Sequence, residues 1–168
     1  LSENGIPNII ASQIAENRTT QSGKFWEGDG KLIVKDRNAL LISSTPKTPT
    51  QLVIPEEGIY VHDQRKRLSV KRFTKHEDFE ISKSTETVHL DADSISFPLC
   101  LRTTKPGDRF IPLGMKGSKL ISDFLTDRKL SVIEKRQQLC LTDSNGRIIW
   151  VVNLRINEKN KTTEKTKN

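Results

Sequence analysis

The sequence predicts an α+β protein with mainly antiparallel sheets, and three observations support this fold class. Short runs of apolar residues alternating with polar ones follow Gly23, as in half-buried strands. Two short stretches of the C-terminal half place apolar residues at helical spacing. An Asn145-Gly146 pair, which favours a type I′ hairpin turn, separates two further apolar runs. The longest apolar run, 148–152, is far shorter than the roughly 18 residues of a membrane helix.

The N-terminal half is expected to hold one connecting helix followed by a β-rich domain. Ile10 and Ile14 are four residues apart within 8–17, which suits a short amphipathic helix in a connecting segment, 1–19. The region 20–97 then has the pattern of a small antiparallel β domain that would contact the substrate. Its expected strands begin with a meander of three and continue at 52–54, 67–73 and 88–90.

The C-terminal half is expected to form a compact α+β domain over 98–157. A strand at 95–103 precedes a helix that Ser118 could cap, and Ser131 with Glu134 forms a capping box for a second helix. The hairpin of 139–142 and 148–152 completes the domain. The remaining segment, 158–168, has no apolar residue and is expected to be a disordered basic tail.

Positive charge is concentrated at the C-terminal end. The whole chain of 168 residues carries 28 Lys and Arg against 21 Asp and Glu. Residues 1–97 hold 13 basic and 14 acidic side chains, whereas 98–168 hold 15 basic and 7 acidic ones. Such a block favours a polyanionic partner, with nucleic acid as the leading candidate. A solubilising surface with a lysine-rich tail is the alternative interpretation.

Cysteine use and the N-terminus indicate a cytoplasmic fragment. Cys100 and Cys140 are 40 residues apart in apolar runs and belong to no CxxC motif, which argues against a disulfide framework. The chain begins at Leu1 and has no basic region followed by an apolar stretch, so we expect a piece of a longer protein without a signal peptide.

The segment 102–119 carries the strongest indication of a binding site. It holds three Gly, two Pro and five cations, and a helix follows it. Gly107, Gly114 and Gly117 allow positive φ angles, so backbone N–H groups could face a phosphate near the helix start. The spacing of Gly114 and Gly117 excludes a P-loop but matches the GxxG of KH domains. A compact turn joining a strand to a helix is the plainer alternative.

Other chemistry-bearing residues have structural interpretations. The three His residues show no metal-binding spacing, so no metal site is predicted. Asp108, Asp123 and Asp127 are expected in local ion pairs or helix caps, and Trp150 in the core rather than as a base-stacking surface. The basic residues at 65–67 with Lys71 and Arg72 form one face of a strand, which is either solvated or a second surface for phosphates.

The stretch PLCLRTTKPGDRFIPLGMKGSKLISDFLTDRKL, with the later GRIIWVVNLRIN, resembles the C-terminal region of bacterial tRNA(Ile)-lysidine synthetases. The resemblance is closest over 98–156. It assigns structural roles to seven residues of the motif: Gly107, Asp108, Phe110, Gly114, Gly117, Asp123 and Phe124. The chain departs from the family pattern at three places. The second Lys of the family's KKL motif is absent, so that Leu120 follows Lys119 directly, and Asn153 stands where the family has Gly. The family's Arg-aromatic-Lys sequence is replaced at 159–161.

The resemblance implies a parent enzyme that uses ATP, with magnesium, to attach lysine to C2 of the wobble cytidine of an isoleucine tRNA with a CAU anticodon. That chemistry belongs to an N-terminal domain with an SGGxDS motif, which this chain lacks, so no catalytic residue and no cofactor are expected here. The fragment would instead position tRNA from the acceptor-stem side, with a fold similar to a domain of the phenylalanyl-tRNA synthetase β subunit. A homodimer is possible, and the absent catalytic domain is the expected protein partner.

Eight cations are predicted to contact tRNA phosphates: Arg102, Lys105, Arg109, Lys116, Lys119, Arg128, Lys129 and Arg155. A protein-docking or interdomain scaffold without direct RNA contact is the alternative function. An editing-type hydrolase is a second alternative, which only the likeness to a synthetase domain suggests.

Overall fold

The computed structural model describes residues 8–16, 24–36, 39–44, 51–63, 66–76 and 78–167. The chain divides into two compact units, 1–48 and 49–168. This division differs from the expected boundary near residue 98, which lies inside the second unit. The expected α+β class with mainly antiparallel sheets is confirmed by the element order and strand pairing. Among the described residues, no helix has the length and apolar character needed to cross a membrane.

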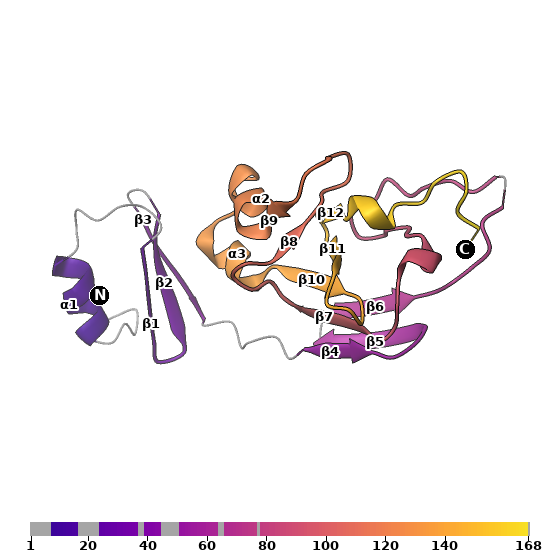
Figure 1. The fold of residues 1–168 in the computed structure, drawn as a ribbon. Coiled ribbons are helices and arrows are strands. Elements are labelled where there is room, and N and C mark those ends of the chain that lie inside the picture. Colours follow the sequence, from indigo (N-terminus) through magenta and orange to yellow (C-terminus); the bar gives the residue numbers. More distant parts are fainter. Residues whose placement is uncertain are drawn as a thin grey trace. The chain divides into compact units, whose positions relative to one another are not determined.

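The first unit is a helix packed on a three-stranded meander (Figure 1). Helix α1 (Asn8–Glu16) precedes strands β1 (Phe25–Gly28), β2 (Lys31–Asp36) and β3 (Ala39–Ser44), which pair in sequence order. Ile10 and Ile14 of the helix are buried against Trp26 and Ile33 of the sheet. The 3.6-residue spacing therefore correctly predicted both the helix and its buried side.

The second unit is built on a five-stranded antiparallel sheet with the order β12-β11-β10-β7-β4. The strands are β4 (Leu52–Ile54), β7 (Leu99–Thr103), β10 (Leu139–Thr142), β11 (Ile148–Val151) and β12 (Arg155–Ile156). Strand β4 pairs with β7, so that Ile54 lies opposite Leu99. This long-range pairing places residues of the expected β-rich domain in the same sheet as the C-terminal hairpin, which explains why no boundary falls at residue 98.

The sheet separates two hydrophobic clusters. On one face, helix α2 (Ile121–Asp127) buries Phe124 and Leu125 against Cys140 and Val151. The other face is covered by the hairpin of β5 (Gly58–Asp63) and β6 (Lys66–Val70), together with residues of the segment 88–97. Trp150 belongs to this second cluster and is 4% exposed, which confirms its predicted place in the core.

Two local helix signals had different outcomes. Helix α3 (Val132–Gln137) begins with the predicted capping box, in which Ser131 Oγ accepts from the Glu134 N–H and the Glu134 side chain accepts from the Ser131 N–H. The predicted cap at Ser118 is wrong, because α2 begins at Ile121 and Leu120 precedes it without a side-chain cap. Residues 119–120 form strand β9 (Lys119–Leu120), paired with β8 (Arg109–Phe110), so the chain is extended where a cap was expected.

The C-terminal segment is ordered in the structure, so the prediction of a disordered tail is wrong for its described residues, 158–167. A 3-10 helix, η3 (Glu158–Asn160), follows β12, and Asn160 is buried. The Asn160 side-chain amide donates to Ser94 Oγ at 2.8 Å, and Leu90 forms a β-bridge with Lys161. Polar hydrogen bonds to a distant loop hold this segment, which its lack of apolar residues did not reveal.

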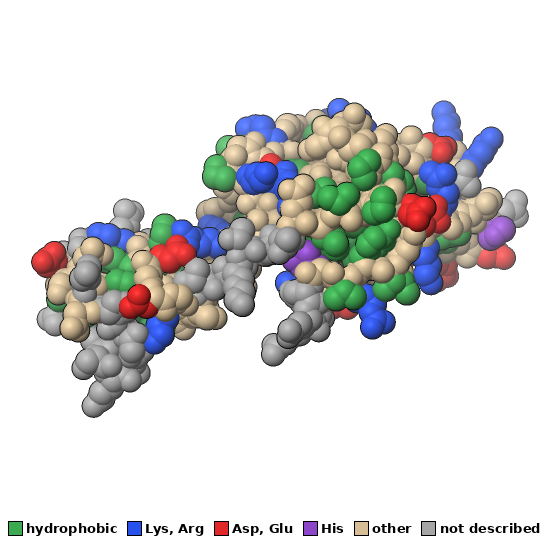
Figure 2. Space-filling model, turned by 90° about the horizontal axis from the view of Figure 1, so that it is seen from below, with side chains coloured by type: hydrophobic (Ala, Val, Ile, Leu, Met, Phe, Trp, Pro, Cys, Tyr) green, Lys and Arg blue, Asp and Glu red, His purple; other side chains and the backbone are tan. Residues whose placement is uncertain are grey.

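The exposed surface of the second unit carries both apolar and basic side chains (Figure 2). Val53, Ile59 and Val61, on strands β4 and β5, are each more than half exposed. Ile59 and Val61 belong to the hairpin of β5 and β6, whereas the loop predicted to bind phosphate follows β7 and leads to α2.

Candidate functional site

The cationic loop that links β7 to α2 is fixed at both ends by backbone hydrogen bonds. Its first part turns at Pro106-Gly107, where Gly107 has φ +87° and the Asp108 N–H donates to the Lys105 carbonyl at 3.1 Å. Its end is held by the β8–β9 pair and by the Ile121 N–H, which donates to the Asp108 carbonyl at 2.9 Å. The loop is therefore a preformed structure rather than a flexible connection.

A charged clamp between Arg102 and Asp108 holds the base of this loop. The guanidinium donates two hydrogen bonds to the carboxylate, at 2.8 and 3.0 Å, and each side chain is 14% exposed. The Lys105 N–H donates to the same carboxylate at 2.7 Å. Burial alone would raise the pKa of Asp108, but these hydrogen bonds outweigh it and the pKa is lowered. The hydrogen bond to Asp108 likewise raises the pKa of Arg102.

The middle of the loop lies against the C-terminal segment. The Leu113 N–H donates to the Ile156 carbonyl at 3.0 Å, and the Glu158 N–H donates to the Ile111 carbonyl at 2.7 Å. The Gly114 N–H, at a residue with φ +89°, donates to Glu158 Oε2 at 2.7 Å. This hydrogen bond is the main cause of the lowered pKa of Glu158. The amide that we expected to face a phosphate is thus directed at a carboxylate of the same chain.

Four of the eight predicted phosphate contacts are engaged within the protein. Arg102 is clamped to Asp108, and the Arg109 guanidinium donates to Ser118 Oγ at 3.3 Å. Lys119 forms an ion pair with Asp127, and the Arg128 guanidinium lies 4.5 Å from the ring centroid of Phe124. Binding a phosphate through any of these groups would compete with an existing interaction, so they are weaker candidates than the sequence suggested.

The other four cations are exposed. They are Lys105, Lys116, Lys129 and Arg155. Among the residues that the structure describes, their side chains form no ion pair and no hydrogen bond. Lys105 and Lys116 are in the loop, and Arg155 is in β12. The loop lies beside β12, because the Leu113 N–H donates to the Ile156 carbonyl. The loop and β12 therefore present cations whose charge is available to a partner.

The seven motif residues have mainly structural contacts. Phe110 and Phe124 pack edge to face with their ring centroids 5.1 Å apart, beneath the loop. Gly107 and Gly114 adopt positive φ angles, as predicted, but Gly117 does not. Asp123 is exposed in the first turn of α2, where its charge favours the helix start. Asp108 and Asp127 form the expected local ion pairs, whereas Asp123 forms none among the described residues.

Sequence reasoning missed Glu158, which lies 44 residues from its partner Gly114. No periodic pattern or motif connects a lysine-rich tail to a glycine loop, so only the fold could reveal the contact. In the described part of the chain, no group of three or more His, Cys, Asp or Glu residues is placed to hold a metal ion. Cys100 and Cys140 are both free thiols.

Comparison with known proteins places the second unit in a known family. Residues 99–168 match the family described as the TilS substrate C-terminal domain, so the chain carries a substrate domain of this class. It is 37% identical over 169 residues to a tRNA(Ile)-lysidine synthase of Parabacteroides distasonis, covering 99% of this chain and 38% of the relative. It is 34% identical over 163 residues to the Bacteroides thetaiotaomicron enzyme of the same name, covering 97% of this chain and 35% of the relative.

The chain therefore corresponds to the C-terminal portion of the tRNA(Ile)-lysidine synthases, as its motifs indicated, and spans little more than a third of the length of these two relatives. Among solved structures, one titled "Crystal structure of TILS C-terminal domain" aligns with a TM-score of 0.40 and 17% identity, covering 85% of this chain and 82% of that one.

Proposed function

We propose that this chain binds tRNA for a lysidine-forming enzyme and that the loop 104–118, β12 and Lys129, which follows α2, contact the phosphate backbone. The observation that carries this proposal is the set of four exposed cations on a fixed scaffold: Lys105, Lys116, Lys129 and Arg155. Their positions are set by the fold before binding, which lowers the conformational cost of binding. The names of the similar enzymes, which act on tRNA(Ile), support the choice of partner.

The contacts are proposed to position tRNA rather than to read its sequence. Lysine and arginine at exposed sites attract phosphates of any sequence, whereas base readout needs side chains that reach base edges. The acceptor-stem side of an isoleucine tRNA with a CAU anticodon is the proposed target. Selection of that tRNA, and attachment of lysine to its wobble cytidine, would depend on the rest of the enzyme.

The loop does not fit the triphosphate of ATP. Gly114 and Gly117 are too close for a P-loop, and the Gly114 amide donates to the negative carboxylate of Glu158. We therefore propose that ATP and magnesium bind the catalytic domain of the parent enzyme and not these residues. The same domain is the proposed protein partner, in the cytoplasm. We propose no catalytic residue in this chain. Pairing of two copies into a homodimer is tested by the mass of the chain in solution.

Salt dependence of tRNA binding tests the proposal directly. If all four exposed cations contact phosphates, log affinity should fall against log salt with a slope of about −3 to −4. A variant with Lys105, Lys116, Lys129 and Arg155 all changed to Ala should bind weakly and with a flat salt dependence. Lys83→Ala provides the control, since Lys83 is equally exposed but lies outside the loop and β12.

The alternative of a docking or scaffold module makes a different prediction. In that case the chain would not bind tRNA at all, and the quadruple variant would lose contact with the catalytic domain instead. Fluorescence anisotropy with labelled tRNA, followed by pull-down of the separately expressed catalytic domain, distinguishes these two functions.

A further inference from the structure

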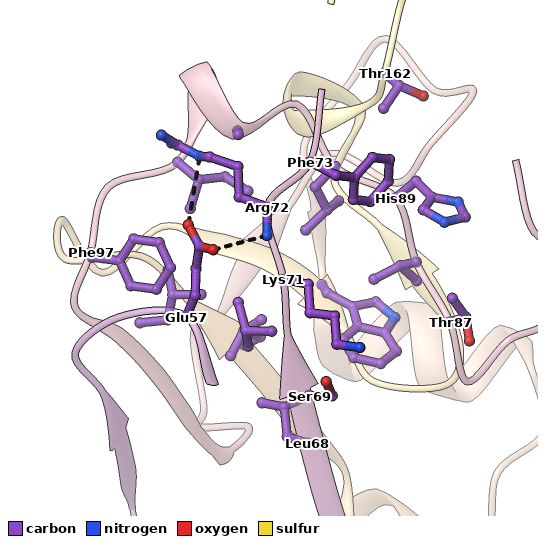
Figure 3. Close-up of a pocket in the computed structure, with 18 of the residues that line it drawn as sticks. Glu57, Leu68, Ser69, Lys71, Arg72, Phe73, Thr87, His89, Phe97 and Thr162 are labelled. Atoms are coloured by element: carbon purple, nitrogen blue, oxygen red, sulfur yellow. Dashed lines mark hydrogen bonds and ion pairs between the residues drawn. The ribbon is translucent and has the colours of Figure 1, made fainter. Parts of the chain in front are cut away.

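A cavity of about 510 Å³ lies on the hairpin side of the five-stranded sheet, away from the cationic loop (Figure 3). This volume is in the range of cavities that hold small organic molecules. Its lining includes apolar side chains of the sheet, Leu99, Leu141 and Trp150, which are almost fully buried. Strand β6 with its extension to Lys75, the segment 86–97 and the C-terminal Thr162 and Thr166 supply the rest.

The cavity wall is held by hydrogen bonds between segments far apart in the chain. The Lys75 N–H donates to the Lys167 carbonyl, and Lys75 Nζ donates to the Thr163 carbonyl, both at 2.8 Å. The bridge between Leu90 and Lys161 fixes the next part of the C-terminal segment. The ordered C-terminal segment therefore completes this cavity.

Exposed cations follow strand β6 beside the cavity. Alternation along the strand places Arg67, Ser69 and Lys71 on the same side, each side chain exposed and successive ones about 7 Å apart. Within the described residues, neither Arg67 nor Lys71 forms an ion pair or a side-chain hydrogen bond. Arg72, by contrast, is engaged, because its backbone N–H donates to the Glu57 carboxylate at 3.2 Å (Figure 3).

Phe73 and His89 lie on the side of the strand to which Lys71 points (Figure 3), and Phe79 packs against both to complete a cluster of three rings. Phe73 and Phe79 have ring centroids 5.3 Å apart, and His89 packs edge-on against Phe79 at 4.8 Å. Phe73 is 48% exposed, so its side chain is accessible to a ligand. His89 Nδ1 accepts the Ser82 N–H at 3.2 Å, which fixes the orientation of the imidazole.

We propose that this cavity receives an unpaired nucleotide of the bound RNA. The base stacks against the rings of Phe73 and its neighbours, and Lys71 and Arg67 pair with the adjacent phosphates. Aromatic surfaces beside cations are the combination that holds single-stranded nucleic acid without sequence preference. The inference rests on the proposed tRNA-binding function and adds a second type of contact, to single-stranded RNA.

Charge and shape argue against other ligands. Lys71, Arg67, Arg72 and Lys75 outnumber the acidic lining residues Glu57 and Glu86, so a cationic ligand is disfavoured. A purely apolar ligand would leave the row of exposed cations along β6 without a function. A base inside a duplex cannot place its face against Phe73, because its neighbours in the stack already cover both faces.

The test compares two RNA probes with the full chain. One is a blunt 12-base-pair duplex, and the other is the same duplex with a four-nucleotide single-stranded extension that contains 2-aminopurine. Phe73→Ala should weaken binding of the extended probe by about 5- to 30-fold and leave the blunt duplex unchanged. Phe73→Trp should restore binding, and the change in 2-aminopurine fluorescence on binding should be absent only in the Ala variant.

Phe25→Ala is the matched control, since Phe25 in the other unit is 44% exposed but distant in sequence from the cavity. Equal affinity of the extended and blunt probes, with no effect of Phe73→Ala, would overturn this inference and leave the proposed tRNA binding intact. Binding to neither probe would overturn the proposed function itself. Competition by an acidic peptide that depends on Phe73 would show a protein ligand instead and would also overturn the inference.

Discussion

The Gly114 N–H donates a hydrogen bond of 2.7 Å to Glu158 Oε2, across 44 residues of sequence. The glycine has φ +89°, a conformation that few other residues adopt easily, and the same carboxylate pairs with Lys161. This contact joins the cationic loop to the C-terminal segment, which continues to the wall of the cavity. The Glu158 carboxylate thus adds a side-chain link to the backbone hydrogen bonds that join the loop to the C-terminal segment.

Glu158→Ala should loosen the loop. It removes a negative charge, so it takes no cation away from the proposed RNA-binding surface. The Gly114 amide would lose its acceptor, so its hydrogen exchange should become faster and the Tm should fall. Glu158→Gln keeps an acceptor oxygen and should have a smaller effect on both measurements. Glu164→Ala removes an exposed acid of the same segment and should leave Gly114 exchange unchanged. Unchanged exchange in Glu158→Ala would show that the hydrogen bond does not stabilise the loop.

The clamp between Arg102 and Asp108 should make stability dependent on pH. Asp108→Asn leaves the mostly buried Arg102 guanidinium without its counter-charge and should cost about 3 kcal/mol of unfolding free energy. Asp123→Asn, at an exposed site of α2, should cost far less. Chemical denaturation at pH 7 measures both changes.

The direction of the pH effect follows from the lowered pKa of Asp108. The folded state holds the ionised carboxylate more strongly than the unfolded chain, whose Asp pKa is about 3.8. The stabilisation is therefore complete above pH 5 and is lost as the pH falls below 3.8 through the folded-state pKa. Asp108→Asn should remove this part of the acid-induced destabilisation. An identical pH profile in the variant and the parent chain would contradict the role of the clamp.

Local patterns predicted local structure well. The helix near Ile10, the meander after Gly23 and the capping box at Ser131 depend on residues close in sequence, where periodicity and side-chain chemistry suffice. The pairing of β4 with β7 joins residues more than 40 positions apart, and nothing in the short apolar run at 52–54 reveals its partner. The domain boundary was misplaced for that reason.

The site was only half predictable for a related reason. A glycine-rich loop with exposed cations does form at the predicted place, but sequence spacing could not show which charges would be engaged. Lys119 and Asp127 meet because an extended β9 leads directly into a short helix, and Arg128 folds back over Phe124. These contacts depend on where α2 starts. The predicted cap at Ser118 placed this start too early.

Exposed and engaged cations should therefore respond differently to substitution. Lys116→Ala should weaken binding of every tRNA to a similar extent and reduce the salt slope by about 1, with no loss of stability. Lys119→Ala breaks the ion pair with Asp127, so its main effect should be on Tm, with a smaller effect on the salt slope. Anisotropy titrations at several salt concentrations, with melting curves of each variant, separate the two. Equal salt slopes in both variants would show that Lys119 is also free to bind phosphate.

Cys140 should be unreactive until the central sheet opens. Its side chain is fully buried in β10, between β7 and β11, and burial raises its pKa from 9.0 to about 12. The thiolate fraction near pH 8 is then about 1,000-fold lower than for an ordinary thiol, and alkylation requires the thiolate. Mass spectrometry after iodoacetamide treatment should show Cys140 unmodified in the native chain and fully modified in denaturant. Modification of Cys140 in the native chain at the rate seen in denaturant would mean that β10 separates from its neighbours readily, and the sheet could not then hold the cavity and the loop in place.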